Sequence, residues 1–440
     1  MSPRTRELLG LLPVSLLVTA GFTAVLIART GANINKATIT YGAIFLGACL
    51  VGHIFIRARL PHADPYMYPL VALLSGIGLV ELYRINPNLA WKQATLFGVG
   101  LALFVATVLF LRDYRALERY RYTIAIVSIL LLLAPRLPGI GRATNGAYLS
   151  IGVGPLEFQP AEFAKIGIVI FLASYLNDVR DVLVRGRVPR ISMKHLGPLL
   201  VIWGMAMLML VFIRDLGSSL MFFGAFLALL YVSTNRLSLV IPQLLIFCAA
   251  AYFLGKSIPH VQDRVQAWLH PFDRELYEMP GGSYQIAQSL FAQADGGLFG
   301  RGFGEALLTQ VGQGGKPSPI VPAAHTDLIY AVIVNEVGLF GGAAILAIGL
   351  LFVARGFKTA TVAGDGFAKL LATGLTAVFA IQIFVIVGGV TKVIPLTGVT
   401  LPFVSYGGSS IVANFVLLAL VLIVSDRARR DPLADRGGIV

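Results

Sequence analysis

Residues 93–111, QATLFGVGLALFVATVLFL, contain no charged side chain. A helix needs about 20 mainly apolar residues to cross a bilayer, so this stretch predicts a membrane-spanning helix. Eleven further stretches have a similar character: 8–28, 38–56, 66–83, 122–134, 160–176, 196–213, 216–232, 237–254, 328–354, 368–390 and 411–424. The sequence therefore predicts an all-α polytopic membrane protein with about twelve transmembrane helices.

The composition of the 440-residue chain supports this fold class. Hydrophobic side chains make up 57% of the chain and charged ones 13%, whereas a soluble domain has about 45–50% apolar and about 25% charged residues. These values exclude a soluble enzyme, a disordered protein and a disulfide scaffold. Cys49 and Cys248 both fall within apolar stretches, and we expect them to be small buried hydrophobic side chains.

The net charge of +13 comes from 35 Lys and Arg against 22 Asp and Glu. The basic residues lie in short segments between apolar stretches, which is typical of cytoplasmic loops beside anionic membrane lipids and argues against nucleic acid as a partner. Alternating the loops between the two sides gathers most basic residues on one side and places both termini in the cytoplasm. No small-residue cleavage site precedes Arg29, so we expect the first helix to be a retained anchor.

Two connections on the opposite, outer side are unusual. Residues 256–326 are too long for a structureless loop in a compact protein. Within them Val261, Val265, Trp268 and Leu269 share one helical face, with polar residues that include Arg264 between them, which predicts a short amphipathic helix along the membrane interface. Residues 391–410 are rich in Gly, Pro, Ser and Thr, and such backbone is tolerated only against protein or a water-filled cavity. We therefore place the function on the outer face.

Charged residues also occur at membrane depth. Glu162 and Lys165 are three positions apart on one helical face and can pair, and Arg214 and Asp215 lie between two apolar stretches. Each such charge costs about 2.5–3.5 kcal/mol on insertion scales. We expect Glu162, Lys165 and Asp215 to form one charged cluster, which serves either to order the bundle or to line a cavity for a charged substrate.

Further polar residues lie around the tenth predicted helix. Thr326 and Asp327 precede it and are suited to cap it. Glu336, nine residues later, points away from Asp327 and is expected to pack against another helix, while Glu81 has no evident partner. The glycine-rich run 296–304 resembles a phosphate loop, but no predicted strand precedes it, so a tight turn is the default interpretation.

Five motifs occur together in the order FQPAEFAK (158–165), DLGSSL (215–220), YQIAQSLFAQADGGLFGRGFG (284–304), PAAHTDLIYAVIVNEVG (322–338) and PLTGVTLPFVSYGGSS (395–410). In the identity and order of these motifs the chain resembles the SEDS family (shape, elongation, division and sporulation), the RodA/FtsW/SpoVE-type peptidoglycan glycosyltransferases. The resemblance covers about 66–425. It implies a ten-helix core with two additional helices in residues 1–65, the external loop 256–326, and a cytoplasmic tail at 426–440.

The resemblance also implies an activity. The expected substrate is lipid II, a disaccharide-pentapeptide on a polyprenyl diphosphate, which the enzyme polymerises into glycan strands on the outer face of the bacterial cytoplasmic membrane. Asp327 is the expected catalytic base. The residues expected to contact substrate or line the cavity are Glu162, Lys165, Asp215, His325, Thr326, Gln285, Gln288, Ser289, Ser405 and Tyr406. A divalent cation, Mg²⁺ or Mn²⁺, is the expected cofactor, although no ligand spacing identifies its site.

The resemblance further implies a class B penicillin-binding protein as partner, because cross-linking of the glycan needs a transpeptidase. Two alternative functions, a transporter and a lipid flippase, stay open at this point. Twelve helices with a basic central loop at 177–195 resemble a six-plus-six transporter, although no motif repeats between the halves. A lipid II flippase would use the same cavity as a polymerase. The sequence does not distinguish elongation, division and sporulation.

Overall fold

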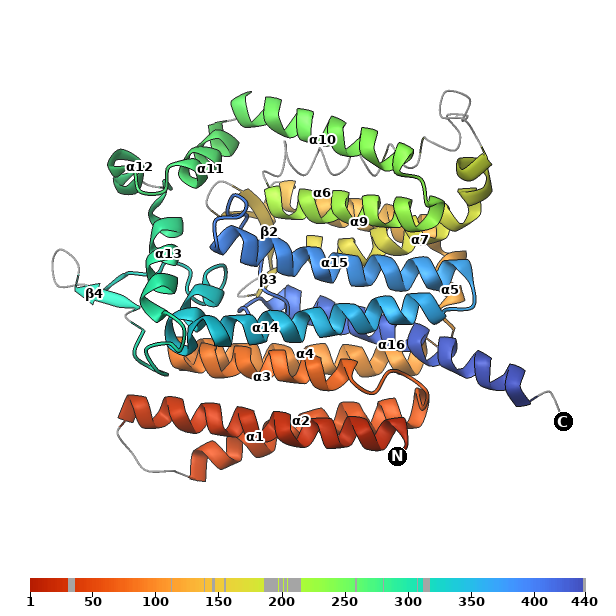
Figure 1. Ribbon diagram of the computed structural model, residues 1–440, viewed down its shortest axis with the longest axis horizontal. Helices are drawn as coiled ribbons and strands as arrows, with labels where there is room; N and C mark the ends of the chain where they lie inside the picture. Colours follow the sequence, from red (N-terminus) through yellow and green to blue (C-terminus); the bar gives the residue numbers. More distant parts are fainter. Residues whose placement is uncertain are drawn as a thin grey trace.

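The computed structural model describes residues 1–30, 36–111, 113–137, 139–144, 147–153, 156–185, 197, 201, 204, 215–257, 259–279, 281–306, 308–311 and 317–437. Its long helices run roughly side by side in one bundle (Figure 1). Both termini lie at one end of the bundle, and the short helices α11 (Pro259–Leu269), α12 (Arg274–Glu278) and α13 (Tyr284–Gly296) lie at the other. The bundle therefore has a terminal end and an end built from the long connection.

The long helices of the bundle are built from the predicted apolar stretches. Their bounds are α1 (Pro3–Thr30), α2 (Lys36–Arg59), α3 (Met67–Ile85), α4 (Pro87–Phe110), α6 (Arg121–Leu133), α7 (Ala161–Arg185), α9 (Leu216–Thr234), α10 (Leu237–Ser257), α14 (Ile329–Val362), α15 (Gly366–Val390) and α16 (Gly408–Gly437). Each overlaps one predicted stretch. The predicted helix at 196–213 lies almost entirely outside the described residues.

The helices differ in how well they suit a bilayer. Among the described residues, eight are long and apolar enough to cross it: α1, α2, α3, α4, α9, α14, α15 and α16. Helix α6 is only 13 residues long, and the apolar part of α10 has 17 residues. Helix α7 carries charged residues at both ends. The all-α polytopic fold is confirmed, while the number of twelve transmembrane helices stays a prediction.

The buried core lies between α15, α16 and their neighbours. These two helices are almost wholly enclosed, with Phe352, Phe379, Phe403 and Phe415 forming a chain of ring contacts through the centre. The outer helices α1, α2 and α4 instead leave large apolar side chains exposed. In a bilayer such side chains contact lipid, so an apolar surface is expected there.

Short strands occur at the end opposite the termini. Strands β1 (Gly141–Thr144), β2 (Ala147–Val153) and β3 (Leu156–Phe158) form an antiparallel sheet. A second sheet pairs β4 (Thr309–Val311) with β5 (Pro317–Pro319). The sequence did not predict these strands, because their few residues show no clear alternation and they lie in loops between helices.

Buried ion pairs tie the first two helices to the rest at the terminal end. Glu7 is fully buried and bonds both Arg4 and His53 Nδ1, the latter at 2.7 Å. The Arg4 guanidinium also donates to the carbonyl of Ala63, in the connection to α3. Asp64 beside it pairs with Arg355 at 2.9 Å and with Arg429 at 2.7 Å. Residues of α1, α2, α14 and α16 thus meet around one short connection.

The short helix α5 (Arg115–Arg119) and a 3₁₀ turn, η1 (Ala134–Arg136), flank α6.

Candidate active site

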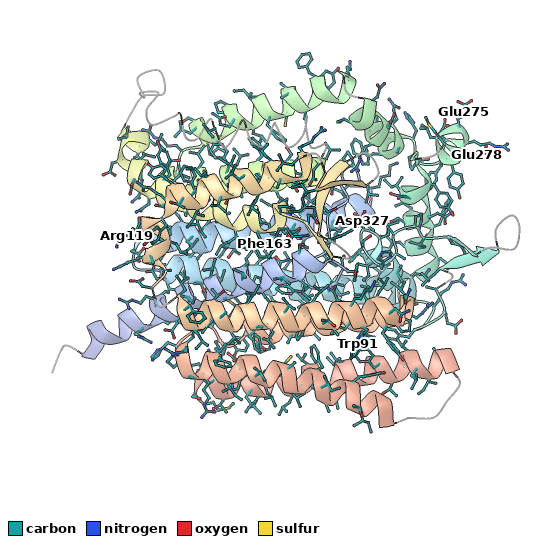
Figure 2. All side chains as sticks on the ribbon, turned by 180° about the vertical axis from the view of Figure 1, so that it is seen from behind. Trp91, Arg119, Phe163, Glu275, Glu278 and Asp327 are labelled. Carbon is teal, nitrogen blue, oxygen red and sulfur yellow. The ribbon has the colours of Figure 1, made fainter. Side chains whose placement is uncertain are left out.

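Asp327 lies just outside the first turn of α14, at the end of the bundle away from the termini (Figure 2). Residues 322–328 form turns, and the N-cap position of α14 is Leu328, which makes no side-chain capping bond. The Thr326 hydroxyl donates to the carbonyl of Ala323 at 3.3 Å instead. The interpretation of Thr326 and Asp327 as a helix cap is therefore wrong.

The loop 391–407 holds this turn in place. The Ser405 hydroxyl donates to the carbonyl of Thr326 at 2.7 Å, and the Tyr406 amide donates to the carbonyl of His325 at 2.8 Å. The His325 and Tyr406 rings lie with centroids 5.9 Å apart. These four predicted site residues are therefore brought together beside Asp327.

Backbone strain occurs in both the turn 322–328 and the loop 391–407. Ala323 has φ +49° and Phe403 has φ +65°, a region that residues with a Cβ rarely occupy. Gly398 has φ +76°, and a Cβ added there would lie 3.7 Å from Asp327 Oδ2. Strained conformations of this kind persist where the surrounding structure fixes them, and they concentrate at functional sites.

Arg264 is the cation of the site. It lies on α11 and donates from Nη1 to the carbonyl of Leu396 at 3.0 Å, while Trp268 Nε1 on the same helix donates to the carbonyl of Lys392 at 3.1 Å. Burial lowers the pKa of Arg264, and the negative charges of Asp215 and Asp327 oppose that change. A guanidinium in the field of two carboxylates stays positively charged.

The amphipathic helix was predicted, but its orientation was only partly right. Val261 is buried and Trp268 is half-buried, as expected. Leu269 is exposed at 48%, which suits an apolar side chain that faces the membrane interface. Arg264 is half-buried against the loop 391–407, although it was assigned to the polar side. Hydrophobic periodicity assumes that a charged residue faces water, so it missed this site residue.

The environment of Asp327 makes it a stronger base than an ordinary carboxylate. Burial raises the pKa of Asp327 to about 6, while the charge of Arg264 and the neighbouring Thr326 side chain oppose the rise. A carboxyl group with that pKa is mostly ionised at neutral pH and still accepts a proton readily. Burial also lowers the pKa of His325, which keeps its imidazole neutral at pH 7.

Lys165 is buried at 1% exposure and pairs with Glu162 on α7, as predicted. It also donates to Gln382 Oε1 on α15 at 2.8 Å, and Gln382 Nε2 donates to the carbonyl of Thr400 at 3.0 Å. The pair is thus linked through Gln382 to the same loop that holds the turn around Asp327.

Asp215 is placed differently from the prediction. Its carboxylate caps α9 by accepting from the Ser218 amide at 2.9 Å and from the Ser218 hydroxyl. Burial raises the pKa of Asp215; the Ser218 bonds and the charge of Arg264 oppose this, and the charge of Glu162 adds to it. Glu162 and Asp215 are therefore neighbours, but the cation beside Asp215 is Arg264 rather than Lys165. Arg214 lies outside the described residues.

The three predicted residues of α13 do not join this group through any described hydrogen bond. Ser289 donates to the carbonyl of Val390 at 2.9 Å and anchors α13 on the end of α15. Gln288 Nε2 donates to the Tyr277 hydroxyl at 2.7 Å, and Gln285 is half-buried in the first turn of the helix. Their contact with substrate stays a prediction.

The glycine-rich run packs against α14. Gly338 interrupts that helix with φ +78°. The amides of Arg301 and Gly302 donate to the carbonyls of Asn335 and Glu336 at 2.9 and 3.0 Å. A Cβ on Gly300 would lie 2.1 Å from the Glu336 carbonyl oxygen, so only glycine fits. These amides are used inside the protein, so the turn interpretation holds and the phosphate-loop interpretation does not.

A buried ion pair fixes the same run to α3. Arg84 Nε lies 2.9 Å from Glu336 Oε1, and Arg84 Nη2 donates to the carbonyls of Gly304 and Ala306 at 2.8 Å each. Glu336 Oε2 accepts from the Gly304 amide at 3.2 Å. Glu336 therefore packs against another helix as predicted. Glu81, on α3, is buried close enough to interact electrostatically with both Arg84 and Glu336.

The described residues offer no evident metal site. They contain no group of three or more His, Cys, Asp or Glu side chains placed to hold an ion. Next to Asp327 and Asp215 the positive charge is that of Arg264. The expected Mg²⁺ or Mn²⁺ therefore stays a prediction.

Comparison with known proteins identifies the family. The model of the FtsW/RodA/SpoVE family of cell cycle proteins matches residues 63–430, which begin after α2. The peptidoglycan glycosyltransferase RodA of Mycobacterium leprae is 39% identical over 98% of this chain and 92% of its own length. A match of that extent includes most of α1 and α2.

Two solved structures share the fold. A chain of a peptidoglycan synthase complex superposes with a TM-score of 0.67 at 27% identity, covering 83% of this chain and 98% of that chain. The crystal structure of the rod shape determining protein RodA of Thermus thermophilus superposes with a TM-score of 0.60 at 26% identity, covering 82% and 96%. These matches confirm the resemblance seen in the motifs. This chain is a multi-pass bacterial membrane protein and belongs to the FtsW/RodA/SpoVE family.

Proposed function

We propose that this protein is a peptidoglycan glycosyltransferase that polymerises lipid II into glycan strands, with Asp327 as the catalytic base. The observation that carries the proposal is the placement of Asp327. Its carboxylate lies outside α14, near the half-buried cation Arg264, under a loop whose backbone is fixed around it. The activity is the one named in the M. leprae relative.

The chemistry needs one base and no acid. Transfer of a sugar from an α-linked diphosphate to a β-1,4 linkage inverts the anomeric carbon, so a single displacement suffices. In that step the acceptor 4-hydroxyl oxygen bonds to C1, the C1–O bond to diphosphate breaks, and the hydroxyl proton passes to Asp327. The diphosphate leaves as a stable anion, unlike the leaving group of a glycosidase, which needs a protonating carboxyl group.

Arg264 is suited to two tasks. Its charge keeps Asp327 ionised at neutral pH, and a guanidinium binds phosphate oxygens through paired hydrogen bonds. We propose that Arg264 faces the diphosphate of the donor, while neutral His325 and Thr326 orient the acceptor. Glu162, Lys165 and Gln382 then support the loop 391–407. Gln285 and Gln288 line the approach from α13, which Ser289 anchors on α15.

A divalent cation remains part of the proposal as a group that accompanies the diphosphate. Such an ion would neutralise charge on the leaving group. The described side chains supply too few ligands for a resident site, so the steps above are assigned only to residues of the chain.

The orientation follows from charge and geometry. The terminal end carries the buried pairs of Arg4, Arg355 and Arg429 as well as the exposed Arg119 (Figure 2). We propose that this end faces the cytoplasm, by the positive-inside rule, so that both termini are cytoplasmic and Asp327 opens to the outer face. The lipid tail then stays in the bilayer while the sugar reacts outside.

The partner we propose is a class B penicillin-binding protein. The solved chain with the TM-score of 0.67 comes from a complex that coordinates polymerization and crosslinking. A polymerase of this family would gain a transpeptidase in the same way. The RodA names of the M. leprae and T. thermophilus relatives favour a function in cell shape and elongation over division or sporulation.

The test is direct. Purified protein receives labelled lipid II in detergent, where no two membrane compartments exist, and products are separated by length. We expect glycan chains, and none with heat-denatured protein. A protein that makes no chains in detergent but moves lipid II across vesicle membranes is a flippase, which would overturn the proposal.

A further inference from the structure

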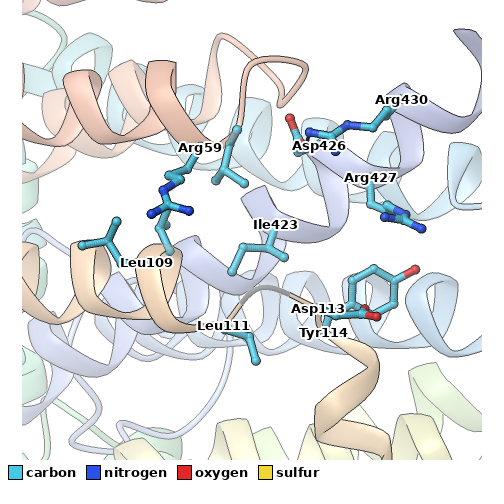
Figure 3. Close-up of a pocket in the computed structure, with 11 residues that line it drawn as sticks. Arg59, Leu109, Leu111, Asp113, Tyr114, Ile423, Asp426, Arg427 and Arg430 are labelled. Carbon is cyan, nitrogen blue, oxygen red and sulfur yellow. Dashed lines mark hydrogen bonds and ion pairs between the residues drawn. The ribbon is translucent and has the colours of Figure 1, made fainter.

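A cavity lies at the terminal end of the bundle, far from Asp327. Its volume is about 190 Å³, and it opens between the ends of α2, α4 and α16 (Figure 3). The lining residues are Arg59, Leu60, Val108, Leu109, Leu111, Asp113, Tyr114, Ile423, Asp426, Arg427 and Arg430. Three arginines thus meet two aspartates around an apolar wall.

The acidic groups of this cavity are already engaged. Asp426 Oδ1 accepts from the His62 amide at 2.8 Å, and Asp426 Oδ2 pairs with Arg430 at 3.2 Å. Asp113 Oδ1 accepts from the Arg115 amide at 3.0 Å. The Tyr114 hydroxyl donates to Asp365. The carboxylates therefore serve the protein's own amides and one of its arginines.

Unlike these carboxylates, Arg59 is not engaged by the described residues of the protein. It is the last residue of α2 and is exposed, and within the described part of the chain its guanidinium makes no hydrogen bond or ion pair. Figure 3 shows it entering the cavity from the α2 side, with Arg427 and Arg430 across from it on α16. The cavity therefore has a net positive charge and a guanidinium available for an anion.

One side of the cavity is an apolar wall. Val108 and Leu109 lie in the last turn of α4 and Leu111 follows it, and Ile423 faces them from α16. Both helices are long and apolar enough to cross a membrane. Arg427 and Arg430 stand at the end of the spanning part of α16, and Arg59 at the end of α2. An anion that enters this cavity has basic groups around its head and hydrocarbon beside it.

We propose that this cavity binds the phosphate headgroup of an anionic glycerophospholipid, with its acyl chains along the exposed face of α4. Basic pockets between membrane helices suit such headgroups, and each basic residue near an anionic surface contributes about 1 kcal/mol. A zwitterionic lipid carries a compensating positive charge, which the arginines repel. The site is independent of the polymerisation chemistry at Asp327.

The experiment is native mass spectrometry of the full chain in detergent, titrated with phosphatidylglycerol or with phosphatidylcholine of the same acyl chains. We expect preferential binding of phosphatidylglycerol. Arg59→Gln should weaken that binding about fivefold, the equivalent of one basic contact. Arg57→Gln is the matched control, because Arg57 is exposed on the same end of α2 and does not line the cavity. It should leave the affinity within a factor of two.

Three results would overturn the proposal. Equal binding of the two lipids would show that the headgroup charge is not recognised. Equal weakening by Arg57→Gln and Arg59→Gln would show diffuse attraction to a basic surface. Displacement of the lipid by an equal concentration of glycerol phosphate would show a site for free anions, which does not use the apolar wall. Unfolding midpoints of both variants establish that the protein is intact.

Discussion

Replacement of Arg264 by Gln should change how polymerisation depends on pH. The Asp327 pKa is about 6, and the charge of Arg264 holds it below the value that burial alone would give. An adjacent guanidinium typically lowers a carboxyl pKa by about 1–3 units. Without it we expect the Asp327 pKa to rise to about 7 or higher.

The direction of the effect follows from the protonation state that the mechanism needs. A base acts only when ionised, so activity rises with pH through the pKa of Asp327. At pH 7 a group with a pKa of about 6 is about nine-tenths ionised, whereas one with a pKa of about 7 is about half ionised. Arg264→Gln should therefore move the acidic limb of the rate profile to higher pH and recover part of the lost rate near pH 9.

The assay is the initial rate of glycan synthesis from labelled lipid II between pH 5 and pH 9, at saturating substrate. Arg274→Gln is the control, because Arg274 lies on the neighbouring α12, is 90% exposed and pairs with the exposed Glu278. Arg264→Lys keeps the charge and should keep the acidic limb near its original position. An unchanged acidic limb in a folded Arg264→Gln variant would refute the electrostatic coupling between Arg264 and Asp327.

Three further predictions concern the surrounding structure. Lys165→Ala leaves the buried Glu162 carboxylate without its cation, which typically costs about 3–5 kcal/mol, so thermal stability and polymerisation should fall together; a variant as stable and active as wild type would contradict this. Arg84→Gln should cost a similar amount because it leaves Glu336 unpaired, and limited proteolysis should cut the glycine-rich run faster, whereas Arg301→Gln at an exposed pair should change neither. Chelation of divalent cations should lower polymerisation without lowering the unfolding temperature, and a large drop in that temperature would indicate a resident metal that contributes to folding.

The sequence predicted the bundle because its signal is local. Each described long helix corresponds to one apolar stretch, and the pairing of Glu162 with Lys165 follows from their spacing on one helix. Asp327 was identified as the candidate base through the family motif. Its spacing alone favoured a helix cap, which the start of α14 at Ile329 excludes.

The contacts that escaped prediction are those between distant segments. Arg264 becomes a site residue only because α11 docks on the loop 391–407, more than 120 residues later in the chain. Arg84 meets Glu336 across the bundle, and no pattern in either helix identifies the partner. The carboxylates of Asp215 and Asp426 are likewise used by backbone amides, which a sequence pattern does not show.

The most direct test of the central claim is the rate of lipid II polymerisation by Asp327→Asn. The amide keeps the size of the side chain but cannot accept the acceptor's proton as a carboxylate does. We predict a rate lower by about 10²–10⁴-fold, the range typical of a lost general base, with an unfolding midpoint near that of wild type and unchanged binding of the transpeptidase partner. A folded Asp327→Asn protein that polymerises lipid II at a near-normal rate would contradict the account and assign the proton transfer to another group.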